Sequence, residues 1–469
     1  MFNNAFFKRQ FSLSMYKNKK LPLGQMSFSK DFVTDKRGDL YPIVYKSEAC
    51  NEYVTHNTYV TKNGICERFI TSFFPFATYE MCFEGQCAGF GFKLKGTYTQ
   101  IICKNNCVHF KSDSETKSLP LEIPTNVIRM IVSCRPSAFD VYFKINGCAE
   151  FFTTFDCNEF ANSNMYNEFS EGYVSVICEN ATVHSAEAYI DCGISQADMR
   201  PIRYENGDVI VDHGKVYLTM SIRMQEKMFQ GIFSWIPTTS QIELTGAVFF
   251  DNGDGRWCGD VASSILYNRN TNTWYLWVAS FNHGHLLAHA EFDGDIRFGV
   301  NVVDVTLMQM KENSDICDFT AKAHDEDPDF YYDERQNKWY MAICRKDPSI
   351  NAYRYFFFES NNPFDEYTYI GQGNDGAETG GSFVSVNDEK VFMCGNDFKS
   401  RANYRIYTKN NMYTAKFDFD DGGFRGWGTL MPIKFGSRTR YFHMTFDRHN
   451  GSDYNWSYGN IYCYEMNFR

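Results

Sequence analysis

The chain has 469 residues, of which 43% are hydrophobic and 17% aromatic, so it can build large cores and is not a disordered protein. Asp and Glu outnumber Lys and Arg by 57 to 46, which gives a formal net charge of −11. Because no stretch is strongly basic, we expect neither nucleic acid nor a membrane surface as a partner.

The N-terminal twenty residues lack the apolar core and small-residue cleavage site of a signal peptide. No run of about 18 apolar residues occurs, so no transmembrane helix is expected. Most of the 16 cysteines lie in apolar stretches, where a free thiol behaves as a small hydrophobic residue. These features predict a cytoplasmic protein with reduced cysteines, or a secreted one if a leader has been removed.

Two close cysteine pairs raise the question of a metal site. Cys82 lies near Cys87 in sequence, and Cys103 lies near Cys107. Their spacing is loose, and no histidine is placed to complete a tetrahedral set of ligands. The sequence therefore predicts no metal site at these cysteines.

Residues 1–197 read as short alternating strands separated by turn residues, which is typical of an antiparallel β-sandwich. Within them, residues 126–152 show a strand, a turn, a second strand and an Asn146-Gly147 hairpin turn. That segment resembles the concanavalin-type jelly roll of legume lectins. We therefore predict an N-terminal jelly-roll sandwich.

The pattern changes between Gln196 and Pro201, where we place the boundary and expect Arg200-Pro201 to act as a linker. Residues 198–469 then repeat one unit: a polar lead residue, an apolar strand, a turn and a strand rich in Tyr and Trp. The lead residues are Asp208, Asp260, Asp327, Glu378 and His443. A period of this size with several strands per unit is typical of a β-propeller.

A five-bladed propeller gathers the starts of its inner strands around one axis, so five regularly spaced polar residues could form one cluster. The predicted fold is thus all-β, with an N-terminal jelly-roll sandwich followed by a five-bladed propeller.

The ordered motifs of the repeats can be compared with a known family. They read Trp257-Cys258-Gly259-Asp260, Asp327-Pro328-Asp329-Phe330, Glu378-Thr379-Gly380-Gly381 and Phe442-His443-Met444. Their order and spacing resemble the five-bladed propeller glycoside hydrolases of family 43 and its relatives. The resemblance implies an enzyme that cleaves a glycosidic bond in a plant or microbial glycan, with furanosides such as arabinosides favoured.

Glycosidic hydrolysis needs one protonated carboxylic acid and one carboxylate. The resemblance implies Asp208 as the base, Glu378 as the acid, Asp327 as the residue that tunes the acid, and an inverting reaction. Blade one departs from the family pattern, because no proline follows Asp208. Three further acidic residues therefore remain alternatives for the base: Asp198, Glu205 and Asp212.

Four more residues are candidates for contacts with an oligo- or polysaccharide substrate: Trp257, Asp260, His285 and His443. Each also has a structural interpretation, since Asp260 could close a turn and His443 could be a core histidine. No cofactor is predicted, although the resemblance leaves open a structural or axial Ca²⁺.

A second function stays open on the sequence. The missing prolines and the unsettled base are equally compatible with a non-catalytic, lectin-like propeller that binds carbohydrate. The two functions differ in whether the predicted carboxylates converge on one site.

Overall fold

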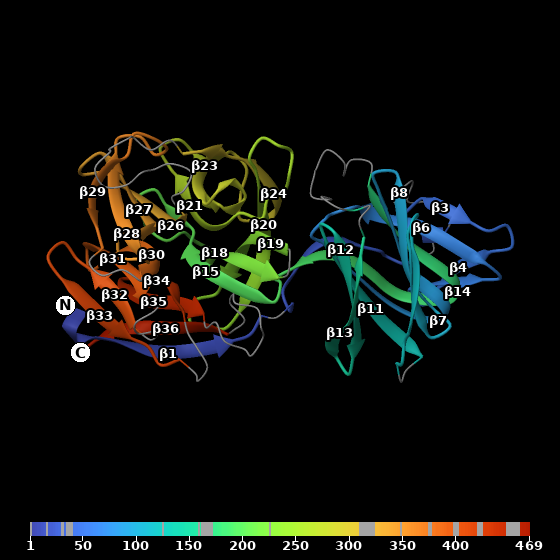
Figure 1. The fold of residues 1–469 in the computed structure, drawn as a ribbon. Helices are drawn as coiled ribbons and strands as arrows, with labels where there is room; N and C mark the ends of the chain where they lie inside the picture. The colour runs from blue at the N-terminus through green and yellow to red at the C-terminus, as the bar shows by residue number, and fades with distance from the viewer. Residues whose placement is uncertain are drawn as a thin grey trace. The chain divides into compact units, whose positions relative to one another are not determined.

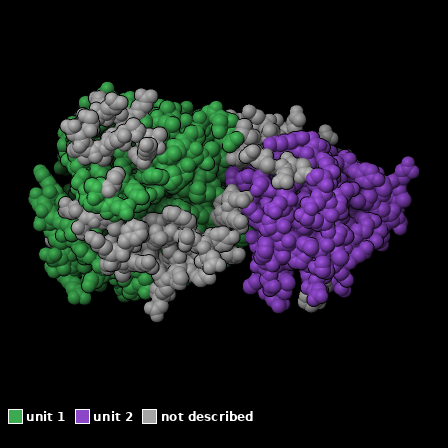
Figure 2. All heavy atoms as spheres, viewed as in Figure 1, with its two compact units in different colours: residues 1–19, 192–469 green, residues 20–191 purple. Residues whose placement is uncertain are grey.

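The computed structural model describes residues 2–15, 17–29, 32–33, 41–123, 126–157, 160, 172–224, 227–308, 324–347, 349–373, 378–396, 403–419, 425–446 and 460–469. The chain forms two compact units (Figure 2). One unit comprises residues 20–191, and the other comprises residues 1–19 together with residues 192–469. The chain therefore passes from one unit to the other twice.

The first unit is a β-sandwich built on two long strands that pair with each other, β7 (Thr78–Leu94) and β14 (Tyr173–Asp191). Its other strands are β2 (Lys20–Gln25), β3 (Ile43–Lys46), β4 (Asn51–Thr55), β5 (Thr58–Lys62), β6 (Ile65–Ser72), β8 (Thr97–Lys104), β9 (Cys107–Lys111), β10 (Thr116–Pro120), β11 (Val127–Arg135), β12 (Ala138–Ile145) and β13 (Cys148–Asp156).

Both long strands belong to two layers. The first half of β7 pairs with β11, which continues to β12 and β13, and its second half pairs with β8 and onward to β9 and β10. Phenylalanine side chains fill the space between the layers: Phe92 lies 4.7 Å from Phe139, and Phe110 stacks on Phe155 at 4.8 Å. Burying such aromatic pairs gives the sandwich its own core.

The second unit is a five-bladed propeller (Figure 1). Its five inner strands are β15 (Ser195–Pro201), β21 (Val261–Asn268), β26 (Asp325–Asp333), β30 (Glu378–Val386) and β34 (Arg425–Phe435). Each inner strand lies next to the following one, and β34 lies next to β15, so the ring closes. The end where these strands begin is called the start end below, and the opposite end is called the finish end.

Each blade is an antiparallel sheet that runs outward from its inner strand. The outer strands are β18 (Lys215–Met224), β19 (Lys227–Trp235) and β20 (Ile242–Asp251) in blade one; β22 (Thr273–Ser280), β23 (Leu286–Phe292) and β25 (Thr306–Leu307) in blade two; β27 (Lys338–Asp347), β28 (Ala352–Ser360) and β29 (Thr368–Gln372) in blade three; β31 (Glu389–Asn396), β32 (Asn403–Tyr407) and β33 (Met412–Lys416) in blade four; and β35 (Arg438–Phe446), β36 (Ile461–Phe468) and β1 (Ala5–Leu13) in blade five.

Short elements complete the blades. The strand β17 (Val211–Asp212) pairs with β18, β16 (Arg203–Tyr204) pairs in parallel with β21, and β24 (Gly299–Asp304) pairs in parallel with β20. Within its described residues, this unit also contains two short 3₁₀ turns, η1 (Phe2–Asn4) and η5 (Phe281–His283). None of the described helical segments could span a membrane.

Aromatic side chains pack the blades against each other. Between blades two and three, Trp277 stacks on Phe330 with ring centroids 4.0 Å apart, and Trp339 lies 6.0 Å from Trp277. The Tyr- and Trp-rich strands of the repeat thus form inter-blade cores, as the alternation predicts. The predicted all-β fold, with an N-terminal sandwich and a five-bladed propeller, is confirmed.

The structure differs from the predicted division at both ends of the sandwich. Residues 1–19 belong to the propeller, because β1 pairs with β36 and supplies the outermost strand of blade five. Arg200-Pro201 is not a linker, since both residues lie in the buried inner strand β15. The second unit resumes at Cys192, ahead of the predicted boundary between residues 197 and 198.

Candidate functional site

Every inner strand carries a β-bulge near its beginning. The pairing register shifts after Ala197 in β15, after Val261 in β21, after Glu326 in β26, after Thr379 in β30 and after Arg425 in β34. Bulges of this kind bend a strand and redirect a side chain, and they are frequent beside active sites. The repetition of the bulge places equivalent backbone positions of the blades around the start end.

In four of the blades the first bulge residue has left-handed backbone geometry. These residues are Asp198 (φ 53°), Ala262 (φ 58°), Asp327 (φ 49°) and Gly380 (φ 57°). Left-handed geometry costs a non-glycine residue about 1–2 kcal/mol, so the aspartates occupy these positions against a conformational penalty. Two carboxylates, from blades one and three, therefore stand at equivalent places and alternate with small residues.

Asp327 is buried at the start end, with 4% of its surface exposed. Its Oδ2 accepts hydrogen bonds from Thr379 Oγ1 at 3.1 Å and from the Gly380 N–H at 3.0 Å. Burial raises the pKa of Asp327 to about 7, and the negative charge of Asp198 is the second cause. Asp327 can therefore hold a proton near neutral pH.

Asp198 is also buried, and it forms an ion pair with Arg223 Nη2 at 3.2 Å. Arg223, on the neighbouring strand β18, is therefore the charge partner of this carboxylate. Of the four acidic residues that the sequence left open as the base, only Asp198 lies at the start end near Asp327.

The structure does not bring Asp208 together with Asp327. Asp208 follows β16 in the turn toward β17, so it lies at the finish end, and its side chain is exposed. The other two alternatives lie there as well: Glu205 pairs with Arg269 at 2.5 Å, and Asp212 pairs with Arg297 at 3.1 Å. All three residues follow β15, which runs from the start end to the finish end, and they are therefore separated from the start end by the length of that strand.

Glu378 begins β30, but its side chain extends away from the inner strands. Its fully buried carboxylate accepts hydrogen bonds from the Tyr355 N–H at 3.1 Å, from Arg405 Nη1 at 3.2 Å and from the Tyr407 hydroxyl. Those partners lie on β28 and β32, the third strands of blades three and four. These contacts anchor the Glu378 carboxylate to the third strands of the two blades and hold it away from Asp327.

Asp260 and Trp257 precede β21, and both are buried. The Asp260 carboxylate accepts hydrogen bonds from Ser280 Oγ at 2.9 Å and from Asn282 Nδ2 at 3.0 Å, and burial raises its pKa. The ring of Trp257 packs 5.0 Å from Phe249. These contacts tie Asp260 to the turn after β22 and Trp257 to blade one.

His285 lies on the loop before β23 and reaches the start of blade three. Its Nδ1 is 3.6 Å from Glu326 Oε1, and its ring lies 4.9 Å from that of His324. Glu326, which directly precedes Asp327, accepts a hydrogen bond from the Tyr353 hydroxyl at 3.2 Å. The sequence pattern did not predict Glu326 as a site residue, although its position directly before Asp327 could have indicated it.

His443 is a core residue of blade five. It is fully buried on β35, and its ring lies 4.6 Å from Tyr404 and 4.7 Å from Phe417. Burial lowers its pKa to about 3, so the imidazole is neutral. The structure therefore supports the core interpretation of this histidine.

The cysteines within the described ranges are free thiols, including Cys82, Cys87, Cys103 and Cys107. Among the same residues, no group of three or more His, Cys, Asp or Glu side chains is arranged to hold a metal ion.

The sequence matches no protein-family model and no curated protein. Solved structures similar to this chain include the catalytic domain of a GH62 α-L-arabinofuranosidase from Coprinopsis cinerea, at 10% identity and a TM-score of 0.39, covering 58% of this chain and 90% of that one. A GH43 β-1,3-galactosidase aligns at 14% identity and a TM-score of 0.40, covering 58% and 94%.

A galectin from Caenorhabditis elegans aligns with 29% of this chain and 98% of its own length, at 11% identity and a TM-score of 0.21. Because all these values are low, the fold assignment rests on the strand topology described above.

Proposed function

We propose that the propeller unit is a glycoside hydrolase that acts on an oligo- or polysaccharide, with Asp198 and Asp327 as its catalytic carboxyl groups. The observation that carries this proposal is the pair of buried aspartates at equivalent bulges of blades one and three. The pKa of Asp327 is raised to about 7, while Asp198 is ion-paired with Arg223. One protonated and one ionised carboxyl group is what glycosidic hydrolysis needs.

In this mechanism Asp327 donates its proton to the glycosidic oxygen as the bond to the anomeric carbon breaks. Asp198 takes a proton from the attacking water, whose oxygen bonds to the anomeric carbon. The hydrogen bonds from Thr379 and Gly380 to Asp327 Oδ2 fix the orientation of the acid. The two protein groups end with their protonation states exchanged, and solvent restores them.

The proposal differs from the roles implied by the sequence resemblance. The acid becomes Asp327 instead of Glu378, whose carboxylate is bound to Arg405, and the base becomes Asp198 instead of Asp208. An inverting reaction and a furanoside substrate such as an arabinoside remain parts of the proposal that rest on the resemblance alone.

The test is the leaving-group dependence of Asp327→Asn. On unactivated oligosaccharides its turnover should fall by about 100-fold or more, the usual contribution of a general acid. On dinitrophenyl glycosides, whose leaving group needs no proton, the loss should be smaller. Asp198→Asn should lose turnover on both substrate types, whereas the exposed Asp304→Asn on β24 serves as the matched control and should keep full turnover.

A second candidate function is a non-catalytic, lectin-like propeller that binds carbohydrate. The ion pair with Arg405 favours it, because it engages Glu378, the acid that the sequence resemblance implies, in a structural contact. If the wild-type protein binds oligosaccharides but releases no reducing ends from any glycoside tested, this second function replaces the first. Unchanged turnover of Asp327→Asn on unactivated substrates would also show that Asp327 is not the acid.

A further inference from the structure

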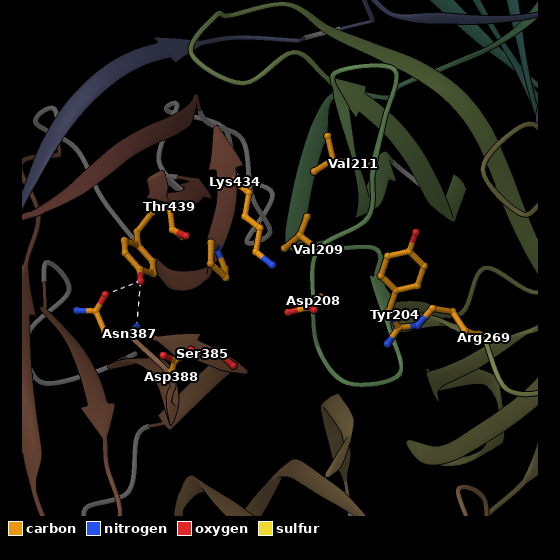
Figure 3. A pocket seen from close by; sticks show the side chains of 12 residues that line it. Tyr204, Asp208, Val209, Val211, Arg269, Ser385, Asn387, Asp388, Lys434 and Thr439 are labelled. Atoms are coloured by element: carbon orange, nitrogen blue, oxygen red, sulfur yellow. Dashed lines mark hydrogen bonds between the residues drawn. The ribbon is translucent and has the colours of Figure 1, made fainter. Parts of the chain in front are cut away.

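A cavity lies at the finish end of the propeller, opposite the proposed catalytic pair. It has a volume of about 580 Å³, within the usual range of about 300–1,000 Å³ for ligand sites. Blades one, two, four and five all contribute to its wall, so it lies around the axis. Figure 3 shows Asp208, Val209 and Val211 on the connection after β16, across from Lys434 and Thr439 of blade five.

The charges in the cavity wall balance. They comprise two acids, Asp208 and Asp388, and two bases, Arg269 and Lys434. Arg269 is already paired with Glu205 at 2.5 Å, and it stacks over the ring of Tyr204 at 4.6 Å. An anionic ligand would meet both aspartates, and a cationic ligand would meet Lys434. The wall therefore favours a neutral ligand.

The remaining polar groups both donate and accept hydrogen bonds. Ser385, Thr439 and Asn387 line the cavity, and Tyr441 holds Asn387 by accepting a hydrogen bond from its N–H at 3.0 Å and donating one to its Oδ1 at 2.9 Å. The dashed lines of Figure 3 mark these two bonds. Hydroxyl and amide groups of this kind pair with ligand hydroxyl groups, which are themselves both donors and acceptors.

Apolar surface lies between the polar groups. Val209, Val211 and Pro432 contribute to the same wall. A second cavity of about 480 Å³ shares Tyr204 and Val211 with the first, and Tyr267 and Trp274 line it as well. The two cavities are therefore neighbours, and the second provides aromatic side chains. Aromatic rings and aliphatic groups suit the C–H faces of a sugar ring.

We propose that the finish-end cavity is a second binding site, separate from the start end, for a neutral oligosaccharide of two or three units. One sugar ring occupies the axial cavity beside Asp208 and Lys434, and the chain continues past Tyr204 into the neighbouring cavity. The site does not depend on catalysis at Asp327, so it goes beyond the proposed hydrolase activity.

The experiment is calorimetric titration of the full chain carrying Asp327→Asn, which should slow hydrolysis of the probes by about 100-fold or more. The neutral probes are xylotriose, arabinotriose, cellotriose and galactobiose, and the charged probes are trigalacturonate and inorganic phosphate. Two further substitutions are tested separately in this background: Val209→Trp, which fills the cavity, and Lys434→Gln, which removes one polar contact. Asp304→Asn is the control.

At least one neutral probe should bind, with its affinity reduced tenfold or more by Val209→Trp, reduced measurably by Lys434→Gln and unchanged by Asp304→Asn. Lys434→Gln changes an exposed side chain, so it tests the site even if Val209→Trp does not fold. The proposal is overturned if none of the neutral probes responds to Lys434→Gln. It is also overturned if only trigalacturonate or phosphate responds.

Discussion

The start end and the finish end of the same five inner strands surround their acidic residues differently. At the start end Asp198, Asp327 and Glu378 are almost fully buried, and each has a specific donor. At the finish end Asp208 and Asp388 are exposed to solvent. Burial at the start end raises the pKa of Asp327, whereas the aspartates of the finish end stay in contact with solvent.

The difference shows that the position of an acidic residue at the start of a repeat does not by itself determine its role. A carboxylate becomes useful for proton transfer when the fold removes it from water and places a like charge nearby. Asp327 meets both conditions, while Asp208 is exposed and fails the first. Four substitutions test how sharply the two ends differ.

The largest effect on stability is expected from Glu378→Gln. It removes one partner of the buried ion pair between Glu378 and Arg405, and breaking a buried pair in this way costs about 3–5 kcal/mol of unfolding free energy. Urea unfolding can follow the propeller alone by tryptophan fluorescence, because all 7 tryptophans lie at residue 235 or beyond. The exposed Glu243→Gln is the matched control and should stay within about 0.5 kcal/mol.

A Glu378→Gln protein of unchanged stability with abolished turnover would contradict the anchoring role. It would return Glu378 to the acid role implied by the sequence resemblance.

His443→Phe should change the pH dependence of stability. The pKa of His443 is about 3 in the folded protein and about 6.5 in the unfolded chain, so the unfolded chain binds the proton first. Stability is therefore intact above about pH 6.5 and is lost as the pH falls toward 3, by about 2 kcal/mol at pH 5. The variant should lack this loss.

The measurement is the unfolding midpoint in urea at pH 7 and pH 5. His213→Gln, at a side chain that is 94% exposed, is the control and should keep the wild-type difference between the two pH values. Equal pH sensitivity in wild type and His443→Phe would show that the imidazole is not kept neutral by burial.

Asp198→Asn should lower the pKa of Asp327 from about 7, because it removes the nearby negative charge that, after burial, contributes most to raising this pKa. A carboxyl group whose folded pKa is raised loses stability as the pH rises from about 4 to 7, since the unfolded chain ionises first. Each unit by which the pKa falls should contribute about 1.4 kcal/mol of stability at neutral pH, which offsets part of the cost of removing the carboxylate from its ion pair with Arg223.

Carbon-13 NMR titration of the aspartate carboxyl groups measures the pKa of Asp327 directly. If it is the same in wild type and in Asp198→Asn, the two aspartates do not interact, and the proposed pair fails.

The smallest effect on stability is expected from Asp208→Asn at the finish end. The exposed side chain accepts a hydrogen bond only from the neighbouring Asn206 Nδ2, at 3.2 Å, among the contacts within the described residues. Its replacement should change the unfolding free energy by less than about 0.5 kcal/mol. A loss of unfolding free energy comparable to that of Glu378→Gln would contradict the proposed difference between the two ends.

Much of the fold could be predicted because three of the repeats are local in sequence. The unit led by Asp260 matches β21 and β22, and the units led by Asp327 and Glu378 match the first two strands of blades three and four. Blade one was harder to assign. Its inner strand, residues 195–201, is buried on both faces, so it has no polar–apolar alternation, and it ends in a proline.

The strand that completes blade five could not be predicted from a local sequence pattern. Ala5 pairs with Phe468, and no feature of residues 5–13 alone assigns them to a strand from the other end of the chain. The same limit applies to Asp198 and Glu378, since each meets its arginine only when the strands of its blade pair into a sheet.

The sequence by itself determined the all-β class, the sandwich, the repeat of the propeller and the choice of Asp327 and Glu378 as residues of interest. Each depends on periodicity or turn chemistry within a few tens of residues. Only the tertiary structure decided that Asp198 joins Asp327, that Glu378 turns toward Arg405, and that Asp208 lies at the other end. Burial and the distances between charges are properties of the assembled blades, and these properties raise the pKa of Asp327.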